Sequence, residues 1–168
     1  MNLEGKVAVI TGSAVRIGRA MALALADAGV DVCIHYHLSQ AAAEQTCNEI
    51  RERGRNATRV SANLSDPETA AAVIFEAAMT AFGKVDILIN NASVFENKSL
   101  TDTTEADWDS HLDINLKSPF FLCQRFAKLL PPRSTGQIVN IVDWRAQRAG
   151  KEHLAYRIFK AGLVFFFF

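Results

Sequence analysis

Short, mostly apolar runs alternate along the chain with longer stretches that have the periodicity of helices. The runs are Val7–Ile10, Val32–Ile34, Thr58–Val60, Val85–Ile89 and Ile138–Val142. Strands that are apolar along nearly their whole length suit a sheet that is covered on both faces. Strand and helix in repeated alternation imply right-handed crossovers between parallel strands. The sequence therefore predicts an α/β fold with a doubly wound parallel sheet.

Residues that begin and end helices stand between these runs. Ser39 can cap a helix that Gly54 closes. Another helix opens with Pro67 in its first turn and Glu68 placed for a capping box, and Gly83 closes it. The crossovers are therefore expected to be helical.

A longer helical pattern covers residues 104–130. Pro119 lies inside it and is expected to kink or interrupt the helix, because proline lacks the N–H that a helix interior requires. The chain has 168 residues and no visible linker or repeat. We therefore expect a single domain over residues 1–164, followed by a tail of four phenylalanines at residues 165–168.

Composition argues against several classes of partner. The chain carries 18 basic and 18 acidic residues and shows no basic stripe, so we expect no nucleic-acid or membrane partner. No apolar run approaches the roughly 18 residues that span a bilayer, and no signal peptide precedes the first strand, so a cytoplasmic location is expected. Cys33, Cys47 and Cys123 form no metal-ligand pattern. They are expected to be reduced thiols near the core, and no metal is predicted.

The first run leads into a glycine-containing turn, Thr11–Gly18, which opens the first helix. Gly12 allows the backbone to turn sharply, and Gly18 allows the helix to pack closely. The helix N-terminus, which includes Ile17, then directs free N–H groups at a pyrophosphate. The turn therefore predicts a dinucleotide site, with an ordinary tight strand-to-helix turn as the alternative.

The end of the second run bears on the choice of cofactor. A site selective for NAD usually carries an acidic residue here, which bonds the ribose 2′-hydroxyl. This segment has no carboxylate and contains His35, Tyr36, His37 and Ser39, with Arg16 in the neighbouring turn. Cationic and hydroxyl groups suit a 2′-phosphate, so NADP is favoured over NAD. The alternative for the two histidines is a pair at a strand end that faces solvent.

Tyr156 and Lys160 lie four residues apart. Residues at this spacing share one face of a helix, so the two side chains should project together. A free phenol titrates near 10 and is a poor proton donor or acceptor at neutral pH. A neighbouring ammonium favours the phenolate, so Lys160 is expected to lower the pKa of Tyr156 and make it an acid–base group.

Taken together, these motifs resemble the short-chain dehydrogenase/reductase family over residues 3–164, which implies a Rossmann-type fold. The turn at 11–18, the Asn90–Ser93 motif, Asn115 and the Tyr/Lys pair occur in the family's order. The resemblance implies that Tyr156 donates the proton and that Lys160 also holds the nicotinamide ribose. It implies that Asn115 supports a proton-relay water. The residues of the motif, Asn90, Asn91, Ala92 and Ser93, are expected to border the cofactor.

Departures from the usual family pattern are similar to those of the pteridine reductases. Asp143 stands where most of the family has serine, Arg16 stands at a common glycine, and Ser93 replaces another. The resemblance implies that Asp143 works with Tyr156 in protonating a ring nitrogen, that Phe95 stacks on the pterin, and that Arg16 contacts both the pyrophosphate and the pterin. Asn63 and Leu64 are implied at the adenine edge.

The resemblance therefore implies an NADPH-dependent enzyme that reduces C=N bonds of pterins, dihydropteridines or dihydrofolate. A carbonyl reductase of the same family, acting on a 3-oxoacyl thioester or another ketone, is the alternative. A third possibility is an inactive fragment that at most binds nucleotide. The expected partner is a small-molecule substrate, and the intact family forms homotetramers.

The chain is expected to be truncated at its C-terminus, and a shifted reading frame would explain the ending Phe165–Phe168. The family continues with further strands, so the last strand here is expected to be an exposed, apolar edge. The helix that carries Tyr156 is expected to keep barely two turns.

Overall fold

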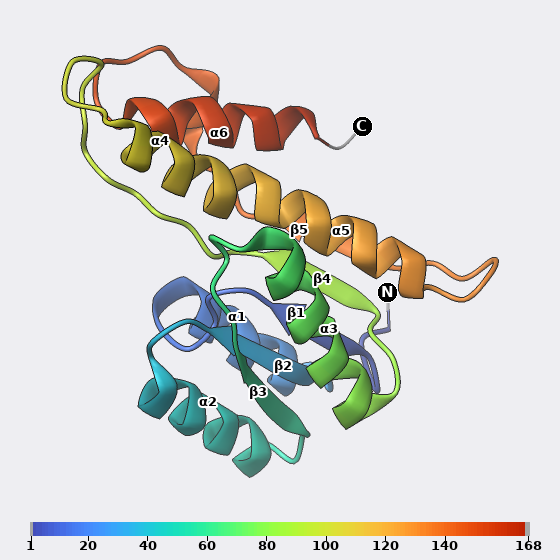
Figure 1. The fold of residues 1–168 in the computed structure, drawn as a ribbon. Coiled ribbons are helices and arrows are strands. Elements are labelled where there is room, and N and C mark those ends of the chain that lie inside the picture. The colour runs from blue at the N-terminus through green and yellow to red at the C-terminus, as the bar shows by residue number, and fades with distance from the viewer. Residues whose placement is uncertain (1, 167–168) are drawn as a thin grey trace.

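The computed structural model describes residues 2–166 (Figure 1). Its core is one sheet of five parallel strands in the order β3-β2-β1-β4-β5. The strands are β1 (Val7–Ile10), β2 (Asp31–Tyr36), β3 (Ala57–Ser61), β4 (Ile87–Asn90) and β5 (Gln137–Asn140). The order reverses direction at β1, as in doubly wound folds. The predicted α/β class, the parallel sheet and all five strands are confirmed.

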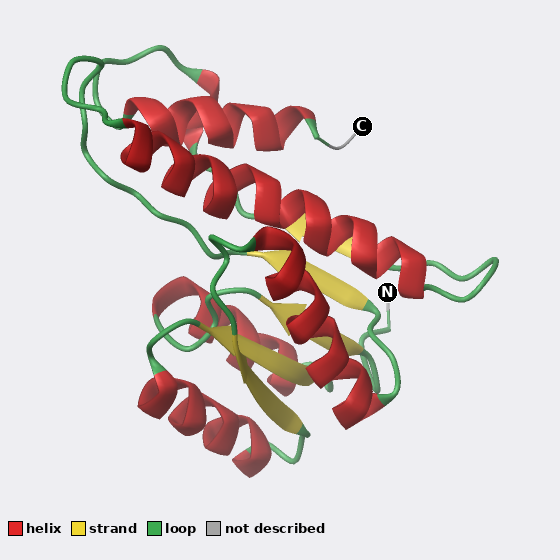
Figure 2. Ribbon diagram, viewed as in Figure 1, coloured by secondary structure: helices red, strands yellow, loops and turns green. Residues whose placement is uncertain are grey.

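Helices cover both faces of this sheet (Figure 2). The elements are α1 (Arg16–Asp27), α2 (Gln40–Glu52), α3 (Pro67–Phe82), α4 (Glu105–Leu112), the π-helical turn η1 (Asp113–Lys117), α5 (Ser118–Leu129), the 3₁₀ turn η2 (Trp144–Gln147) and α6 (Leu154–Phe165). One apolar cluster joins α1 and α2 to the sheet, and a second joins α3 and α5 to it. This two-sided burial explains why the strand sequences lack polar alternation.

The helix ends match the sequence only in part. Pro67 begins α3, and Gly83 ends it in the left-handed conformation with φ of 72°, as predicted. The predicted capping box at Glu68 is wrong, because Asp66 occupies the N-cap position and its side chain makes no capping hydrogen bond. Ser39 precedes α2 but its hydroxyl likewise caps nothing.

A true capping box lies at Thr104, which precedes α4. Its side chain accepts a hydrogen bond from the N–H of Asp107, and the Asp107 carboxylate accepts one from the N–H of Thr104. Together these bonds pair two N–H groups that a helix start otherwise leaves free. They fix the start of the long helix that the sequence predicted.

That long helix is interrupted as expected, by the π-helical turn η1, which ends at Lys117, two residues before Pro119 in the first turn of α5. The α4 part packs against α6, and the α5 part packs against α3 over the sheet. The interruption therefore lies between a half that supports the sheet and a half that supports α6.

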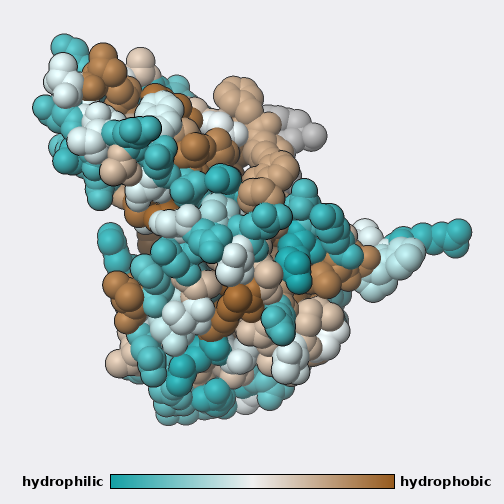
Figure 3. All heavy atoms as spheres, in the orientation of Figure 1, coloured by the Kyte–Doolittle hydropathy of each residue, from teal (hydrophilic) through white to brown (hydrophobic). Residues whose placement is uncertain are grey.

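Strand β5 is the edge of the sheet, and Val139 on it is 42% exposed, in line with the expected apolar edge. Helix α6 is longer than expected, with 12 residues. It ends at Phe165, one residue past the boundary expected at residue 164. The ring of Phe166 contacts that of Phe120, and Phe167 and Phe168 lie outside the described residues. Figure 3 shows apolar surface near this end.

Two further findings concern the described residues alone. All three cysteines are buried and unpaired, as predicted. None of the helices in residues 2–166 has the length and apolar character needed to cross a bilayer.

Candidate active site

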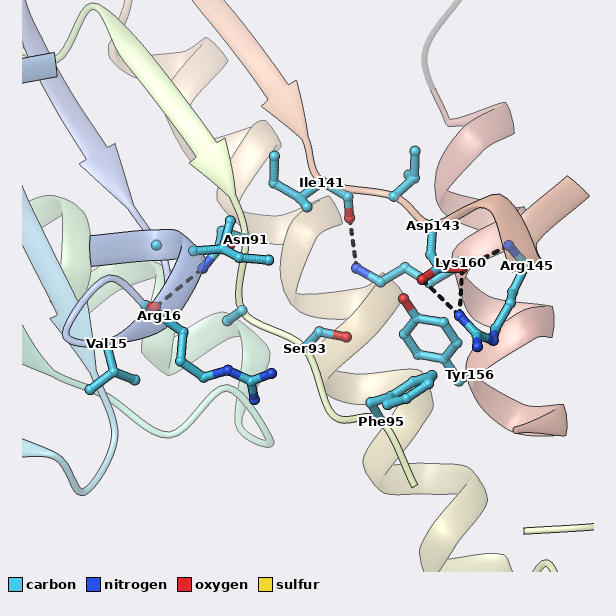
Figure 4. Close-up of a pocket in the computed structure, with 15 residues that line it drawn as sticks. Val15, Arg16, Asn91, Ser93, Phe95, Ile141, Asp143, Arg145, Tyr156 and Lys160 are labelled. Carbon is cyan, nitrogen blue, oxygen red and sulfur yellow. Dashed lines mark hydrogen bonds and ion pairs between the residues drawn. The ribbon is translucent and has the colours of Figure 1, made fainter. Parts of the chain in front are cut away.

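A cavity of about 550 Å³ opens at the carboxyl ends of β1, β4 and β5 (Figure 4). Ligands of open parallel sheets bind at this edge, where the strand order reverses. The cavity brings the nucleotide turn together with the Tyr/Lys helix. Its lining residues are Gly12, Val15, Arg16, Ile17, Gly18, Asn91, Ala92, Ser93, Phe95, Ile141, Val142, Asp143, Arg145, Tyr156 and Lys160.

The nucleotide turn has the backbone geometry that its glycines permit. Gly12 has φ of 63°, and Arg16 adopts a left-handed φ of 53°, which is uncommon for a residue with a side chain. A Cβ on Gly18 would lie 2.6 Å from Asn91 Nδ2 and 2.8 Å from Ser13 Cα. Such distances admit no side chain, so Gly18 is required for the close approach of α1 to the strand ends.

His35 lies inside the protein rather than at a solvent-facing strand end. Its side chain is buried, and its Nδ1 accepts a hydrogen bond from the N–H of Gly12 at 3.0 Å. Its Nε2 is 3.1 Å from the carbonyl of Ala62, to which it donates in this tautomer. Burial lowers the pKa of His35 to about 4. The imidazole is therefore neutral at pH 7, and it stabilises the nucleotide turn on the side that faces the protein core. It does not line the cavity, where its predicted role in cofactor binding would place it.

Most of the other residues expected around the 2′-phosphate and adenine also lie outside the cavity. His37 and Ser39 are exposed just after β2. Tyr36 is buried, and its hydroxyl accepts a hydrogen bond from Arg59 at 3.3 Å. Only Arg16 of the residues predicted for the phosphate lines the cavity.

Asn63 and Leu64 have structural partners within the fold. The side-chain oxygen of Asn63 accepts a hydrogen bond from the N–H of Ser65 at 3.0 Å. Leu64 is buried, and its carbonyl accepts a hydrogen bond from Ser118 at 2.7 Å. Neither residue reaches the cavity, and both shape the loop that leads into α3.

The segment after β4 is tied to the nucleotide turn. Asn91 Nδ2 donates to the carbonyl of Thr11 at 2.8 Å, and the hydroxyl of Thr11 accepts from the N–H groups of Asn91 and Ala92 at 3.0 Å each. Ala92 and Ser93 line the cavity. Asn90 is buried instead, and its Nδ2 donates to Asn140 Oδ1 on the neighbouring strand at 2.9 Å.

Asn115 stands in the π-helical turn with its side chain directed at the same segment. Its Oδ1 accepts hydrogen bonds from the hydroxyl of Ser93 and the N–H of Val94, and its Nδ2 donates to the carbonyl of Val94. The residue is fully buried. Its amide thus fixes the cavity wall, and the structure does not place it among the cavity-lining residues.

Tyr156 and Lys160 project from one face of α6 into the cavity, as their spacing predicts. Tyr156 is 6% exposed and Lys160 is 2% exposed. Lys160 Nζ lies 5.9 Å from the centre of the Tyr156 ring and donates to the carbonyl of Ile141 at 2.8 Å. Both groups are therefore anchored where a bound ligand would meet them.

The expected lowering of the phenol pKa by Lys160 is not found. Burial raises the pKa of Tyr156 to about 12, and the Asp143 carboxylate adds to the rise, whereas Arg145 opposes it. Burial also lowers the pKa of Lys160 to about 8, although Asp143 raises it. The physical reason is first the burial of the phenol, and second that the Asp143 carboxylate faces the phenol while the Lys160 ammonium points at a carbonyl.

Arg145 is a cavity residue that the sequence argument missed. Its side chain pairs with Asp143, with Nη1 3.3 Å from Oδ2, and its guanidinium lies 5.4 Å from the centre of the Phe95 ring. Phe95 stacks on His153 with ring centres 3.9 Å apart and meets Tyr156 edge-on. The arginine stands two positions after Asp143, which is the one signal that could have drawn attention to it. Three further lining residues, Val15, Ile141 and Val142, were also missed.

Known proteins match nearly the whole length of this chain at about one third sequence identity. A 2-dehydro-3-deoxy-D-gluconate 5-dehydrogenase from Dickeya dadantii (strain 3937) is 33% identical over 97% of this chain and 63% of the relative. A 3-oxoacyl-(acyl-carrier-protein) reductase from Synechocystis is 31% identical over 98% of this chain and 66% of the relative. The chain thus spans somewhat less than two thirds of the length of the first of these relatives.

A solved structure adds a match in three dimensions. The FolM alternative dihydrofolate reductase 1 from Brucella suis, in complex with NADP, superposes with a TM-score of 0.88. It is 32% identical and covers 94% of this chain and 65% of its own. The family model described as short chain dehydrogenase matches residues 6–167. The chain therefore belongs to the short chain dehydrogenase family.

Proposed function

We propose that this chain forms the nucleotide-binding and proton-donating part of an NADPH-dependent reductase of pterins. The observation that carries the proposal is the placement of the Asp143 carboxylate beside the Tyr156 phenol, in the cavity that the nucleotide turn borders. Reduction of a C=N bond requires a proton at nitrogen. A carboxylate next to a phenol suits a ring that also presents N–H groups.

The residues of the turn fit a dinucleotide. Gly12 and Gly18 allow the turn, the start of α1 and the segment after β4 to pack closely together, and the free N–H groups at the start of α1 favour a pyrophosphate. Arg16 lines the cavity and can meet a phosphate, and Lys160 can bond ribose hydroxyls. The bound nicotinamide would supply a hydride. The NADP in the similar FolM structure supports the choice of NADP over NAD.

The protein's own groups would handle the proton. The raised pKa keeps the Tyr156 phenol protonated at neutral pH, so the proton is present. It also makes the phenol a weak acid, so proton transfer would require this pKa to fall when cofactor and substrate bind. Asp143 accepts hydrogen bonds from N–H groups in its present surroundings, which is the contact a pterin ring would make. The resemblance to a dihydrofolate reductase supports a substrate of this heterocyclic class.

A carbonyl reductase is the second candidate, favoured by the similarity to the 3-oxoacyl reductase from Synechocystis. A ketone needs one proton at oxygen, which Tyr156 alone can supply, and it has no ring N–H group for Asp143. Asp143 therefore separates the two functions.

The test is NADPH oxidation with biopterin, dihydrobiopterin and dihydrofolate, beside a 3-oxoacyl thioester. Pterin turnover that Asp143→Ser lowers at least tenfold, while Asp109→Ser on the exposed side of α4 leaves it unchanged, would support the proposal. Turnover of the thioester with none of the pterins would overturn it. A thermal melt with and without NADPH separates a chain that does not bind the cofactor from one that binds and does not react.

A further inference from the structure

The carboxylate of Asp143 is already occupied by a planar group of the protein itself. The N–H of Arg145 donates to its Oδ1 at 2.7 Å, and Arg145 Nη1 lies 3.4 Å from Oδ1 and 3.3 Å from Oδ2. Both side chains are about one quarter exposed, at 26% and 25%. The guanidinium is thus held at the carboxylate without being sealed into the core.

The same guanidinium also takes part in the aromatic wall of the cavity. It lies 5.4 Å from the centre of the Phe95 ring and 4.5 Å from that of Trp144. Phe95 carries the His153 ring stacked against it and the Tyr156 ring at its edge. A flat ring that stacks on Phe95 and bonds Asp143 would therefore meet Arg145 at both contacts. Figure 4 shows Arg145 beside Asp143, close to Tyr156 and Phe95.

We propose that Arg145 is a specificity-determining residue whose guanidinium occupies the place of a planar, N–H-bearing substrate edge and must be displaced by it. The inference rests on the proposed function and names the substrate feature that the site selects. A guanidinium is a flat N–C–N group whose N–H donors match a carboxylate, and a 2-amino-pyrimidinone edge has the same pattern. Only ligands with such an edge replace what Asp143 loses when Arg145 leaves.

The guanidinium of Arg145 has another place to go when a substrate displaces it from Asp143. Trp144 is 56% exposed, so the guanidinium can remain against that ring in contact with solvent. The backbone bond from Arg145 to Asp143 does not depend on the side chain and keeps the carboxylate oriented. Ketones have no N–H donor, so they leave Arg145 at Asp143 and meet a narrower cavity.

The experiment measures the affinity of biopterin for the full chain saturated with NADP⁺, so that no reduction takes place. Arg145→Gln removes the competitor, and biopterin should bind about two- to fivefold tighter, the range for partly exposed ion pairs. Arg148→Gln is the matched control, because its guanidinium lies 5.6 Å from the Trp144 ring. It should bind biopterin like the original chain.

The outcomes separate this inference from the function on which it rests. Tighter binding to Arg145→Gln alone supports the competition, and so does binding seen only with that variant. Equal or weaker binding to Arg145→Gln, with normal thermal melts, overturns the competition and leaves the pterin function standing. If biopterin binds neither the original chain nor Arg145→Gln, although NADP⁺ binds both, the pterin function is overturned and this inference with it.

Discussion

His35 and Gly12 are joined by a hydrogen bond in which the buried imidazole accepts the N–H of the glycine at 3.0 Å. The carbonyl of His35 also accepts from the N–H of Ser13 at 3.0 Å. The nucleotide turn is therefore held on its inner side by a residue of β2. A phosphate would meet the outer side, so the shape of the turn depends on a residue that the ligand never touches.

Replacing His35 with alanine should destabilise the protein and weaken NADPH binding. The change leaves the Gly12 N–H and the Ala62 carbonyl without their partner, at about 1–3 kcal/mol for each unpaired buried group. Thermal melts with and without NADPH measure both effects. Gln124→Ala is the control, because Gln124 is exposed on α5 and does not line the cavity. A melt of His35→Ala that matches the control would contradict the role of the imidazole.

The stability of the protein should fall as the pH drops from about 6.5 towards 4. The pKa of His35 is about 4 in the fold, against 6.5 for the free side chain, so between these values the unfolded chain binds more protons. The loss through this group reaches about 2 kcal/mol at pH 5. Urea unfolding at pH 7 and pH 5 checks this, with His35→Asn as the comparison. An equally steep loss in His35→Asn would assign the pH dependence to other groups.

Lys160→Met should stabilise the protein while weakening NADPH binding. The pKa of Lys160 is about 8 in the fold, against 10.5 for the free side chain. The unfolded chain therefore binds more protons between these values, and the buried ammonium costs stability at pH 7. Removing the ammonium relieves this cost but also removes its hydrogen bond to the carbonyl of Ile141, so the free energy of unfolding should rise by about 2 kcal/mol in total.

Melting temperatures and NADPH titrations of Lys160→Met measure the two effects together. Lys117→Met serves as the control, because Lys117 is exposed and pairs with Asp113 on its own helix. It should change neither quantity appreciably. A lower melting temperature for Lys160→Met than for Lys117→Met would show that the ammonium is a net stabilising group.

NADPH should bind about ten- to a hundredfold more tightly than NADH, because a charge-assisted hydrogen bond contributes roughly 1.5–3 kcal/mol. Arg16 lines the cavity, and no carboxylate lies between His35 and Ser39. The ratio of the two affinities is expected near ten, since the side chain of Leu38 carries no charge that could bind the phosphate. His37→Asp should reverse the preference by repelling the phosphate. Titrations of both cofactors decide it, and equal affinities in the original chain would mean that these groups do not face the ribose.

The strands and the nucleotide turn could be predicted because burial on both faces leaves a direct mark on the sequence. Val7–Ile10 is apolar throughout and is β1 to the residue. Gly83 ends α3 with a positive φ, which few other residues adopt. These features depend on the residue types of a short segment, so they can be predicted from that segment alone.

The positions of His35 and Arg145 could not be read in the same way, because His35 depends on distant partners and Arg145 depends on the conformation of a turn. A histidine at the end of a strand faces solvent or core according to what lies across the sheet, and here Gly12 and Ala62 offer it a donor and an acceptor. Arg145 points at Asp143 because the 3₁₀ turn η2 places it there. The pKa of Tyr156 was mispredicted because the spacing to Lys160 says nothing of how far the phenol is buried or of where the ammonium points.

The π-helical turn at Asp113–Lys117 has a consequence for how this region tolerates change in length. Each residue advances an α-helix by about 100°, and a π-turn is usually one residue more than the regular helix needs. The wide turn takes up this extra residue, so deleting a single residue there would let a regular helix form with α4 and α5 in nearly the same rotational phase, at the cost of moving Asn115 away from Val94. The same deletion in the regular part of α5 would instead rotate α4 by nearly a third of a turn and turn the face that α4 presents to α6 away from it. The π-turn is thus the place where this long helix best tolerates a change in length.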